Sequence, residues 1–543
     1  MLGIVGASTS CSLIVDSNAD QCTVDADCKG ALLGRTCAKG LCVDKTVTGC
    51  TKNTECREAP FGPLFVCRKS ACVSLTNELC TTIHTTKKVD ADAINDDNAL
   101  VIGSINPTVG DFADYGIVVE DAIKLAIDDF ANTNGIPLAT GTGTRPIVLV
   151  GCNDGPQEDR AVDAAKHLVN DLQVPAIIGY PGSGSTIDVA TEVTNAAGVL
   201  LFSSAATSDG ITKLADNDLV WRTSPPDSFQ ATALGLYYPT VESRAKKLFQ
   251  DITGDVKVAI VYTSDSYGSG LADALQTKLT FNGKSALSQI NTNFKRFDYG
   301  PPEAPDLATV AKVTAFAPHI IFIFGFTEAI DPMLTSIEQA WVAPADKHRP
   351  MWVFSDGALS ATLLTMAITT EELRVRVSGS VPGVLTETYP PYASFLAQWS
   401  ASPYSTGEAN QLGTAGAYDI LYMLAYSAVA VGAKPLTGTN MVKYGLRKMV
   451  PAMGATKVQI GPGNGAINDT FTKLTSGKLI DIEGTSGPLD FDEFGEAPSD
   501  IQIWCMATAP APKLVGDPLN SGLHLDSKTN KLIGQTSSDC GFP

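Results

Sequence analysis

The sequence is poor in basic side chains and in histidine. Its 543 residues include 39 Lys and Arg against 58 Asp and Glu, a net charge of −19, and only five are His. A nucleic-acid surface needs clustered Lys and Arg to neutralise phosphates, so this balance predicts no nucleic-acid partner. No His follows a strand beside a Ser or Cys nucleophile, and no Gly-x-Ser-x-Gly motif occurs. The sequence therefore predicts a protein that is not an enzyme, with no cofactor and no metal.

Long apolar runs are also absent. The longest candidate, residues 420–431, is shorter than the eighteen or more residues that a membrane-spanning helix needs, so no such helix is predicted. The first ten residues are small and apolar and end at Cys11. Two interpretations of residues 1–21 stay open because a basic start is missing. They are the remnant of a lipoprotein signal, with a lipid anchor on Cys11, or an ordinary disordered start.

Cysteine is concentrated at the front, where ten of the thirteen precede residue 81. Two groups of four repeat with a period near thirty residues: Cys22, Cys28, Cys37 and Cys42, then Cys50, Cys56, Cys67 and Cys72. Zinc is the competing interpretation, but no Cys-x-x-Cys pair occurs and His84 is the only nearby histidine. The pattern predicts disulfide-stapled repeats over residues 22–80, and hence an oxidising, exported location.

Beyond a polar segment at 81–97, which reads as a linker, strands alternate with amphipathic helices. Residues 100–105 and 256–262 are typical of buried strands, and 115–132 has the periodicity of a helix. This alternation predicts an α/β fold of two doubly wound lobes with a hinge and an interlobe cleft. Ligands of such sheets bind beyond the carboxyl ends of the strands.

A ligand loop is predicted after the apolar strand at 174–178. Its Gly/Ser sequence runs into a helix that starts near Ser183, and Thr207 follows the next strand at 200–203. Hydroxyls and N–H groups at a helix start suit a small anion such as a carboxylate, although Ser183 also suits a simple helix cap. The loop lacks the Lys-[Ser/Thr] ending of a P-loop, so a nucleotide site is disfavoured.

The order of several segments resembles the type I periplasmic binding proteins, and most closely the branched-chain amino-acid (Leu/Ile/Val) binding proteins of ABC transporters. The segments that carry this resemblance are 102–110, 178–186, 203–207, 222–230, 261–268 and 487–495. The resemblance implies a ligand-binding domain at 98–510. Its first lobe would cover about 98–228 and 380–482, and its second lobe about 229–379 and 483–510. A tail at 511–543 is not covered by the resemblance.

The resemblance also implies seven ligand-binding residues. The carboxylate of an amino acid would meet Ser183 and Thr207, and its ammonium would face the Ala205 carbonyl and Asp356. Across the cleft Tyr267 would close over the ligand, while Asp227 would lie at the hinge-side wall. Two positions depart from the family: Asp356 stands where the family has glutamate, and Phe326 replaces an aromatic residue that carries a hydroxyl.

The function implied by the resemblance is that of an exported solute-binding protein. It would capture an amino acid or a similar small polar molecule between two lobes and deliver it to an ABC permease. A periplasmic or cell-envelope location follows. The alternative is a receptor-type sensing protein that uses the same cleft to signal to a partner.

Overall fold

The computed structural model divides into two compact units, residues 1–75 with 94–97 and residues 76–93 with 98–543. The described residues are 23–24, 36–38, 41–43, 49–57, 61–87, 90–110, 112–139, 141–155, 160–249, 252–302, 304–341, 349–383, 389–405, 407, 409–506, 521–537 and 540. Cys11 and the predicted signal segment lie outside them.

The first unit contains two cysteine hairpins. In one, β3 (Phe65–Arg68) pairs antiparallel with β4 (Ala71–Ser74), with Cys67 opposite Cys72. In the other, β1 (Thr36–Ala38) pairs with β2 (Leu41–Val43), with Cys37 opposite Cys42. The equivalent cross-strand cysteines agree with the predicted repeat in its hairpin half, whereas Cys22 and Cys28 lie outside the described residues.

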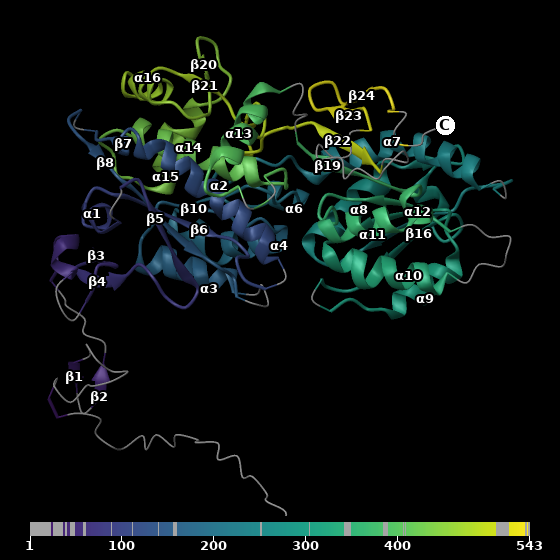
Figure 1. The fold of residues 1–543 in the computed structure, drawn as a ribbon, viewed down its shortest axis with the longest axis horizontal. Helices are drawn as coiled ribbons and strands as arrows, with labels where there is room; N and C mark the ends of the chain where they lie inside the picture. The colour runs from purple at the N-terminus through teal and green to yellow at the C-terminus, as the bar shows by residue number, and fades with distance from the viewer. Residues whose placement is uncertain are drawn as a thin grey trace, which may run out of the picture. The chain divides into compact units, whose positions relative to one another are not determined.

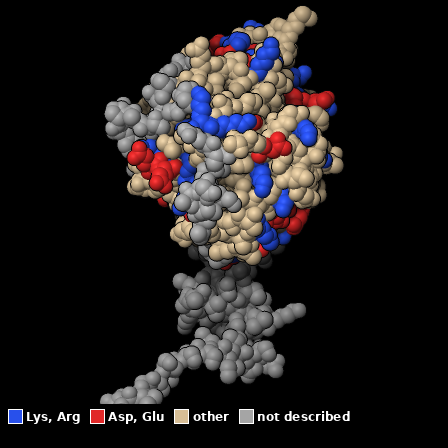
Figure 2. Space-filling model, turned by 90° about the vertical axis from the view of Figure 1, so that its right-hand side faces the viewer, with Lys and Arg blue, Asp and Glu red and all other residues tan. Residues whose placement is uncertain are grey.

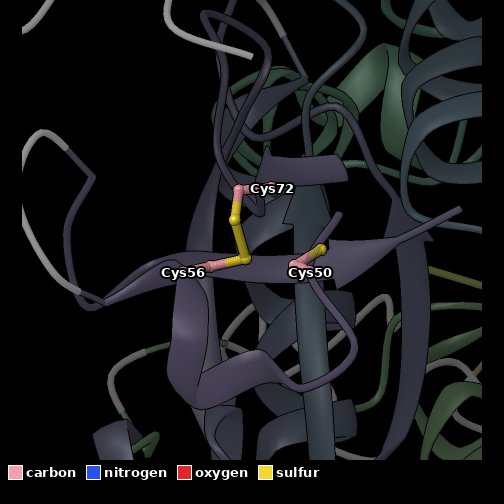
Figure 3. Close-up of side chains that lie close together, drawn as sticks. All are labelled: Cys50, Cys56 and Cys72. Atoms are coloured by element: carbon pink, nitrogen blue, oxygen red, sulfur yellow. A yellow bond between two sulfur atoms is a disulfide. The ribbon is translucent and has the colours of Figure 1, made fainter. Parts of the chain in front are cut away.

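Disulfides staple the second hairpin to the segment before it. Cys67 bonds to Cys50, and Cys72 bonds to Cys56, which lies in a short helix, η3 (Asn53–Cys56). Figure 3 shows that the sulfurs of Cys50, Cys56 and Cys72 gather closely enough to suggest a metal site. All three form disulfide bonds, so none can be a thiolate ligand of a metal.

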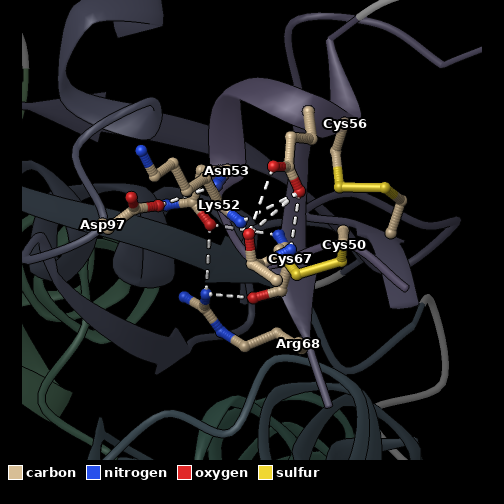
Figure 4. Close-up of a disulfide and its surroundings, with 10 residues drawn as sticks. Cys50, Lys52, Asn53, Cys56, Cys67, Arg68 and Asp97 are labelled. Atoms are coloured by element: carbon tan, nitrogen blue, oxygen red, sulfur yellow. Dashed lines mark hydrogen bonds between the residues drawn. A yellow bond between two sulfur atoms is a disulfide. The ribbon is translucent and has the colours of Figure 1, made fainter. Parts of the chain in front are cut away.

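Asn53 joins the disulfide module to residues 94–97 of the same unit (Figure 4). Its backbone N–H donates to Asp97 at 2.7 Å, and its side-chain amide donates to the carbonyls of Ile94 and Asp96. Its side-chain oxygen accepts from the N–H of Cys67 at 3.0 Å. Because Asn53 is only 3% exposed, these bonds replace water and fix the module without a large apolar core.

The first lobe of the second unit is a six-stranded sheet (Figure 1). Five strands are parallel, and β5 adds an antiparallel edge because it follows no crossover helix. The strand order is β12 (Val220–Arg222), β11 (Leu200–Ser203), β10 (Ala176–Ile178), β6 (Leu100–Ile105), β9 (Ile147–Cys152) and β5 (Cys80–Thr85).

Helices cover both faces of this sheet, as the near-continuous apolar strands require. Leu100 and Ile102 pack in one core with the long helices α2 and α14, whereas Gly103 lies directly under Leu168 on the opposite face. The helices of this lobe are α2 (Ala113–Ala131), α3 (Ala161–Lys166), η4 (His167–Asp171), α4 (Ser183–Val189), η5 (Ala190–Thr194), α5 (Asn195–Ala197), α6 (Asp209–Thr212), α13 (Pro390–Ala401), α14 (Thr414–Ala430), α15 (Gly438–Tyr444) and α16 (Asn464–Thr475).

The second lobe is an eight-stranded mixed sheet. Its order is β16 (Phe294–Asp298), β13 (Val258–Tyr262), β17 (Ile320–Phe324), β18 (Met351–Phe354), β19 (Val377–Pro382), β22 (Ile501–Cys505), β23 (Leu523–Asp526) and β24 (Lys531–Gly534). The first five strands are parallel, and each of the last three is antiparallel to the strand before it. Alternate residues of β13 and β17 face two separate cores, so this sheet is also covered on both sides.

The helices of the second lobe pack on those two cores. On one face lie α7 (Asp227–Leu248) and α8 (Ser266–Lys278). On the other lie α9 (Ala308–Phe316), α10 (Thr335–Ala340), α11 (Ala361–Thr369) and α12 (Glu371–Arg374). Basic and acidic side chains are interspersed over the face of the molecule shown in Figure 2.

Among the described residues, no helix has the length and apolar character needed to cross a bilayer.

Three segments differ from the domain boundaries expected from the sequence. Residues 80–85 form β5 and 90–94 form α1 (Asp90–Ile94), where a linker was expected. Leu489, Phe491 and Ala497 pack in the first-lobe core, so the last crossover comes later than residue 483. The expected tail contributes β23 and β24 to the second-lobe sheet, because their apolar side chains complete its core.

Two further disulfides explain part of this difference. Cys80 of β5 bonds to Cys152 of β9, which fastens the edge strand that replaces the start of the linker. Cys505 of β22 bonds to Cys540, which fastens the end of the C-terminal extension. The sequence left the pairing of these four cysteines open, because spacing alone does not determine which strands become neighbours.

Candidate functional site

Two loops of the first lobe meet at the carboxyl edge of its sheet. Ser183 is the first residue of α4, after β10, and Thr207 lies in the loop after β11. The two strands are parallel neighbours, so their loops leave the sheet at the same edge. The Ser183 hydroxyl accepts a hydrogen bond from the N–H of Ser208 at 3.2 Å, which joins the loops.

Asp227 begins α7, the helix that carries the chain into the second lobe. Its N–H donates to the Thr207 carbonyl at 2.7 Å, and its side chain is fully buried. No described group donates a hydrogen bond of normal geometry to either carboxylate oxygen, but the Thr207 hydroxyl and the charge of Arg222 are close enough to lower the pKa of Asp227. Burial, followed by the charge of Asp356, raises the Asp227 pKa well above its ordinary value.

Tyr267 and Asp356 form a bonded pair in the second lobe. Tyr267 lies in the first turn of α8, Asp356 follows β18, and the tyrosine hydroxyl donates to the Asp356 Oδ1 at 2.7 Å. The same hydroxyl accepts from the N–H of Gly357 at 3.0 Å. Burial raises the pKa of Asp356, and hydrogen bonds from Tyr267 and Gln230 only partly offset this.

Phe326 provides an aromatic contact between the lobes. Its ring centroid lies 5.0 Å from that of Tyr267 and 5.7 Å, edge to face, from that of Phe112 in the first lobe. Its backbone N–H donates to both carboxylate oxygens of Glu328, at 3.0 and 3.1 Å, which fixes the loop after β17. The ring pair forms an apolar wall beside the polar groups.

Polar contacts also cross between the lobes. The Ser208 hydroxyl donates to the carbonyl of Ser266 at 2.9 Å. A Cβ atom on Gly270 would come within 3.2 Å of the Ser208 hydroxyl and 3.7 Å of Asp227 Oδ2. The start of α8 therefore approaches the first-lobe loops closely, and a side chain at 270 would press on both.

These contacts bring the seven predicted residues to the junction of the two lobes. We call the set Ser183, Ala205, Thr207, Asp227, Tyr267, Phe326 and Asp356 the interlobe site; six of its members are buried and Phe326 is half-buried. Ala205 lies two residues before Thr207 in the same loop, and its Cβ would be 2.8 Å from a Cβ added at Gly413. Assignment of these residues to a ligand stays a prediction.

Sequence reasoning missed three neighbours of this site. Phe112 contacts Phe326, Gln230 contacts Asp356, and Tyr115 is close enough for the Asp356 charge, after burial, to raise its pKa. The Tyr115 hydroxyl donates to the carbonyl of Leu412 at 2.9 Å, which fixes the ring. The position of the two aromatics just after β6 was the available signal, because that strand also ends at the ligand edge.

The chemistry of the interlobe site favours a ligand that carries a cation and an anion. Asp227 and Asp356 are both buried, and the charge of one raises the pKa of the other, so a positive group between them would relieve unfavourable electrostatics. The hydroxyls of Ser183 and Thr207 are neutral donors, suited to a carboxylate. The site contains no His, Cys or metal-binding cluster, and it holds its acids beside Tyr and Phe rings.

A protein-family comparison matches residues 99–470 to the model described as periplasmic binding protein. An amino acid binding protein of Pseudomonas aeruginosa is 26% identical over 269 residues, which cover 49% of this chain and 63% of the relative. The Leu/Ile/Val-binding protein BraC3 of Rhizobium johnstonii is 31% identical over 184 residues, which cover 34% of this chain and 45% of the relative. The chain thus spans less than two thirds of these curated relatives.

Solved structures share the fold. The leucine binding protein LivK of Thermotoga maritima aligns with a TM-score of 0.54 at 17% identity, covering 75% of this chain and 95% of that protein. LivJ of Streptococcus pneumoniae, solved with isoleucine, gives 0.51 at 19% identity, covering 75% and 96%. A solute binding protein of Rhodopseudomonas palustris, solved with 3,4-dihydroxybenzoic acid, gives 0.53 at 16% identity, covering 76% and 94%.

Proposed function

The chain belongs to the periplasmic binding protein family, and we propose that this solute-binding protein holds an amino acid at its interlobe site. The observation that carries the proposal is the pair of buried carboxyl groups of Asp227 and Asp356, because Arg222, the cation whose charge lowers the pKa of Asp227, is already paired with Glu496. An ammonium group would supply the missing positive charge. Its three N–H donors match the two carboxylates and the carbonyl of Ala205.

The ligand carboxylate is assigned to the first-lobe loops. Ser183 and Thr207 offer hydroxyls there, at the start of α4 and beside it. A helix N-terminus adds N–H groups and a positive dipole end, so an anion is stabilised without a basic side chain. The absence of Lys and Arg from the interlobe site disfavours a ligand with a second carboxylate.

The side chain of the ligand is assigned to the aromatic wall. Phe112 and Phe326 offer carbon surface only, and Phe326 stands where a hydroxyl-bearing ring was expected from the family resemblance. Burial of an aliphatic side chain against these rings lowers the free energy of binding, whereas a charged side chain would lose its hydration there. Two curated relatives are named Leu/Ile/Val-binding proteins, and these names support the same class of ligand.

The fold by itself does not select the ligand. One structural neighbour was solved with isoleucine and another with 3,4-dihydroxybenzoic acid. Selectivity therefore depends on the local groups, and the Asp227–Asp356 pair is what favours an amino acid over an aromatic acid, which has no ammonium.

Delivery to an ABC permease in an exported location completes the proposal. The family and the transporter-associated neighbours support the permease. The four disulfides between described cysteines support an oxidising compartment, because thiols stay reduced in the cytosol. Lipid attachment at Cys11 would hold such a protein at the membrane.

Thermal unfolding with matched ligands tests the amino-acid assignment. L-leucine at saturating concentration should raise the melting temperature, and the shift should fall strongly with N-acetyl-L-leucine, which lacks the ammonium charge. Leucinamide, which lacks the carboxylate, should be intermediate. The assignment would be wrong if N-acetyl-L-leucine stabilised the protein as much as leucine does. It would also be wrong if none of a panel of twenty amino acids raised the melting temperature.

A second candidate is a receptor-type sensing protein that uses the same site. The observation in its favour is that the cysteine modules form a compact unit of their own, as a docking module would. Chemical cross-linking in cells separates the two: transport predicts capture of a permease, and sensing predicts capture of a signalling protein.

A further inference from the structure

Arg222, the last residue of β12, is fully buried behind the loop that carries Thr207. One guanidinium nitrogen, Nη1, donates to the carbonyl of Ser208 at 2.9 Å and to that of Ala206 at 3.3 Å. These are the carbonyls on either side of Thr207. A planar guanidinium reaches both from one nitrogen while its other nitrogen bonds elsewhere.

The other nitrogen, Nη2, anchors the guanidinium to Glu496 and Thr212. It donates to Glu496 Oε1 at 2.5 Å and to the Thr212 hydroxyl at 2.8 Å, and that hydroxyl in turn donates to Glu496 at 2.7 Å. The backbones are joined as well, because the N–H of Arg222 donates to the Gly495 carbonyl at 3.0 Å. Arg222 is therefore fixed at both ends.

This arrangement determines how the peptide before Thr207 is oriented. In a trans peptide the N–H points opposite to the carbonyl, so a carbonyl of Ala206 turned toward Arg222 turns the Thr207 N–H away from it. Among the described residues, the Thr207 N–H has no hydrogen-bond acceptor, although Thr207 is only 2% exposed. A buried N–H without a partner is rare and is a donor ready for a ligand.

We propose that Arg222 is a positioning residue that points the Thr207 N–H at a ligand carboxylate, with Glu496 and Thr212 as its anchor. The proposal rests on the amino-acid site described above. Glu496 forms an ion pair with the guanidinium, so the part of Arg222 that the Thr207 loop contacts acts mainly through orientation, although its charge still lowers the pKa of Asp227. A ligand carboxylate accepting that N–H forms a charge-assisted hydrogen bond, which is stronger than a neutral one.

The competing explanation is that Arg222 only cross-links β12 to the segment at 495–497. Arg447 provides a matched control, because it holds the same region without touching the loop at 206–208. Its guanidinium stacks 4.4 Å from the Trp221 ring, bonds to Asp218 at 3.0 Å and donates to the Glu493 carbonyl at 2.7 Å. A purely structural role predicts similar behaviour from both arginines.

Hydrogen exchange of the ligand-free protein is the first half of the test. Arg222→Lys retains the charge but lacks the planar fork, so amides at 205–209 should exchange about tenfold faster or more than in the unaltered protein. Arg447→Lys should leave this segment unchanged. If Arg222→Lys does not fold, Thr212→Val, which removes one of the two groups that anchor Nη2, replaces it. Unchanged exchange at 205–209 in the folded variant overturns the proposal.

Calorimetry with L-leucine and L-leucinamide is the second half. Arg222→Lys should weaken leucine binding on the order of 10- to 100-fold, as loss of one hydrogen bond to a charged group implies, and leucinamide binding by less than about threefold. Equal losses for both ligands overturn the proposal. An unaltered protein that binds neither ligand overturns the leucine assignment instead, and the exchange result alone then decides the role of Arg222.

Discussion

The Tyr267 hydroxyl donates a 2.7 Å hydrogen bond to the Asp356 Oδ1, and the two residues come from segments 89 positions apart. Tyr299 offers a matched pair in the same lobe, because its hydroxyl donates to Glu328 Oε1, also at 2.7 Å. Both tyrosines are buried and both bonds involve a carboxyl group. Only the first pair consists of interlobe-site residues; the second pair meets the site only at the backbone, where Glu328 accepts from the N–H of Phe326.

Tyr267→Phe should therefore separate binding from stability. Loss of a hydrogen bond to a carboxyl group should lower the free energy of unfolding by about 1–3 kcal/mol in Tyr267→Phe and in Tyr299→Phe alike. Only Tyr267→Phe should weaken L-leucine binding, by about tenfold, because Asp356 is no longer oriented. Urea denaturation and calorimetry measure the two effects. Equal binding losses in both variants would contradict the assignment of Tyr267.

Ligand binding should release protons. Burial, then the Asp356 charge, raises the pKa of Asp227, and burial raises that of Asp356, so both carboxyl groups keep a proton to a higher pH than free aspartate does. An ammonium group favours the ionised form, so leucine affinity should increase as pH rises from about 5 to 7. Calorimetry in two buffers of different ionisation enthalpy counts the protons released.

Asp227→Asn should reduce this proton release, and Asp129→Asn should not. Asp129 is a suitable control because burial also raises its pKa, while its partners Tyr418, Tyr422 and Gln398 all lie on helices of the first lobe. Proton release that is unaffected by Asp227→Asn would mean that this carboxyl does not face the ligand.

Asp419 should make stability depend on pH. It lies on α14 and accepts hydrogen bonds from the N–H and hydroxyl groups of Thr485 and Ser486, yet burial raises its pKa from 3.8 to about 6. A raised folded pKa means that the folded state binds the proton more tightly. The associated stability, about 3 kcal/mol, is present below about pH 4 and is lost as pH rises to about 6.

The comparison of Asp419→Asn with the unaltered protein isolates this contribution. The asparagine does not titrate, so the difference between the two unfolding free energies should change by about 3 kcal/mol between pH 4 and 7. Asp526→Asn, at an exposed turn, should show no change of that sign because its pKa is lowered by hydrogen bonds from Thr529. Parallel stability curves for Asp419→Asn and the unaltered protein would contradict the prediction.

The Cys80–Cys152 disulfide should stabilise the ligand-binding unit. It joins residues 72 apart in sequence, and removing it by a double serine substitution should cost about 4 kcal/mol through the gained freedom of the unfolded chain. All five Trp residues lie between 221 and 504, so tryptophan fluorescence during urea unfolding reports on this unit.

The serine double variant at Cys50 and Cys67 is the control. That disulfide lies in the other compact unit, so its removal should leave the fluorescence-detected midpoint unchanged. A shift as large as that of the Cys80 and Cys152 variant would show that the two units unfold together.

Local patterns were enough to predict most elements of the lobes. The strand expected at 200–203 is β11 with the same bounds, and that expected at 100–105 is β6. Their continuous apolar character reflects burial on both faces, which is a property of the sequence itself. The edge strand β5 could not be predicted, because His84 and its Thr neighbours are polar and only the disulfide and the β9 partner hold them in a sheet.

The sequence by itself determined the fold family, the disulfide character of the cysteine repeats and the residues that the resemblance assigns to an amino acid. The tertiary structure alone decided which cysteines pair, that Phe112 meets Phe326, and that Arg222 and Glu496, 274 positions apart, clamp the loop at Thr207. The physical reason is that apolar periodicity and turn residues act over a few positions. Contacts between distant segments depend on how two sheets and three crossovers bring those segments together.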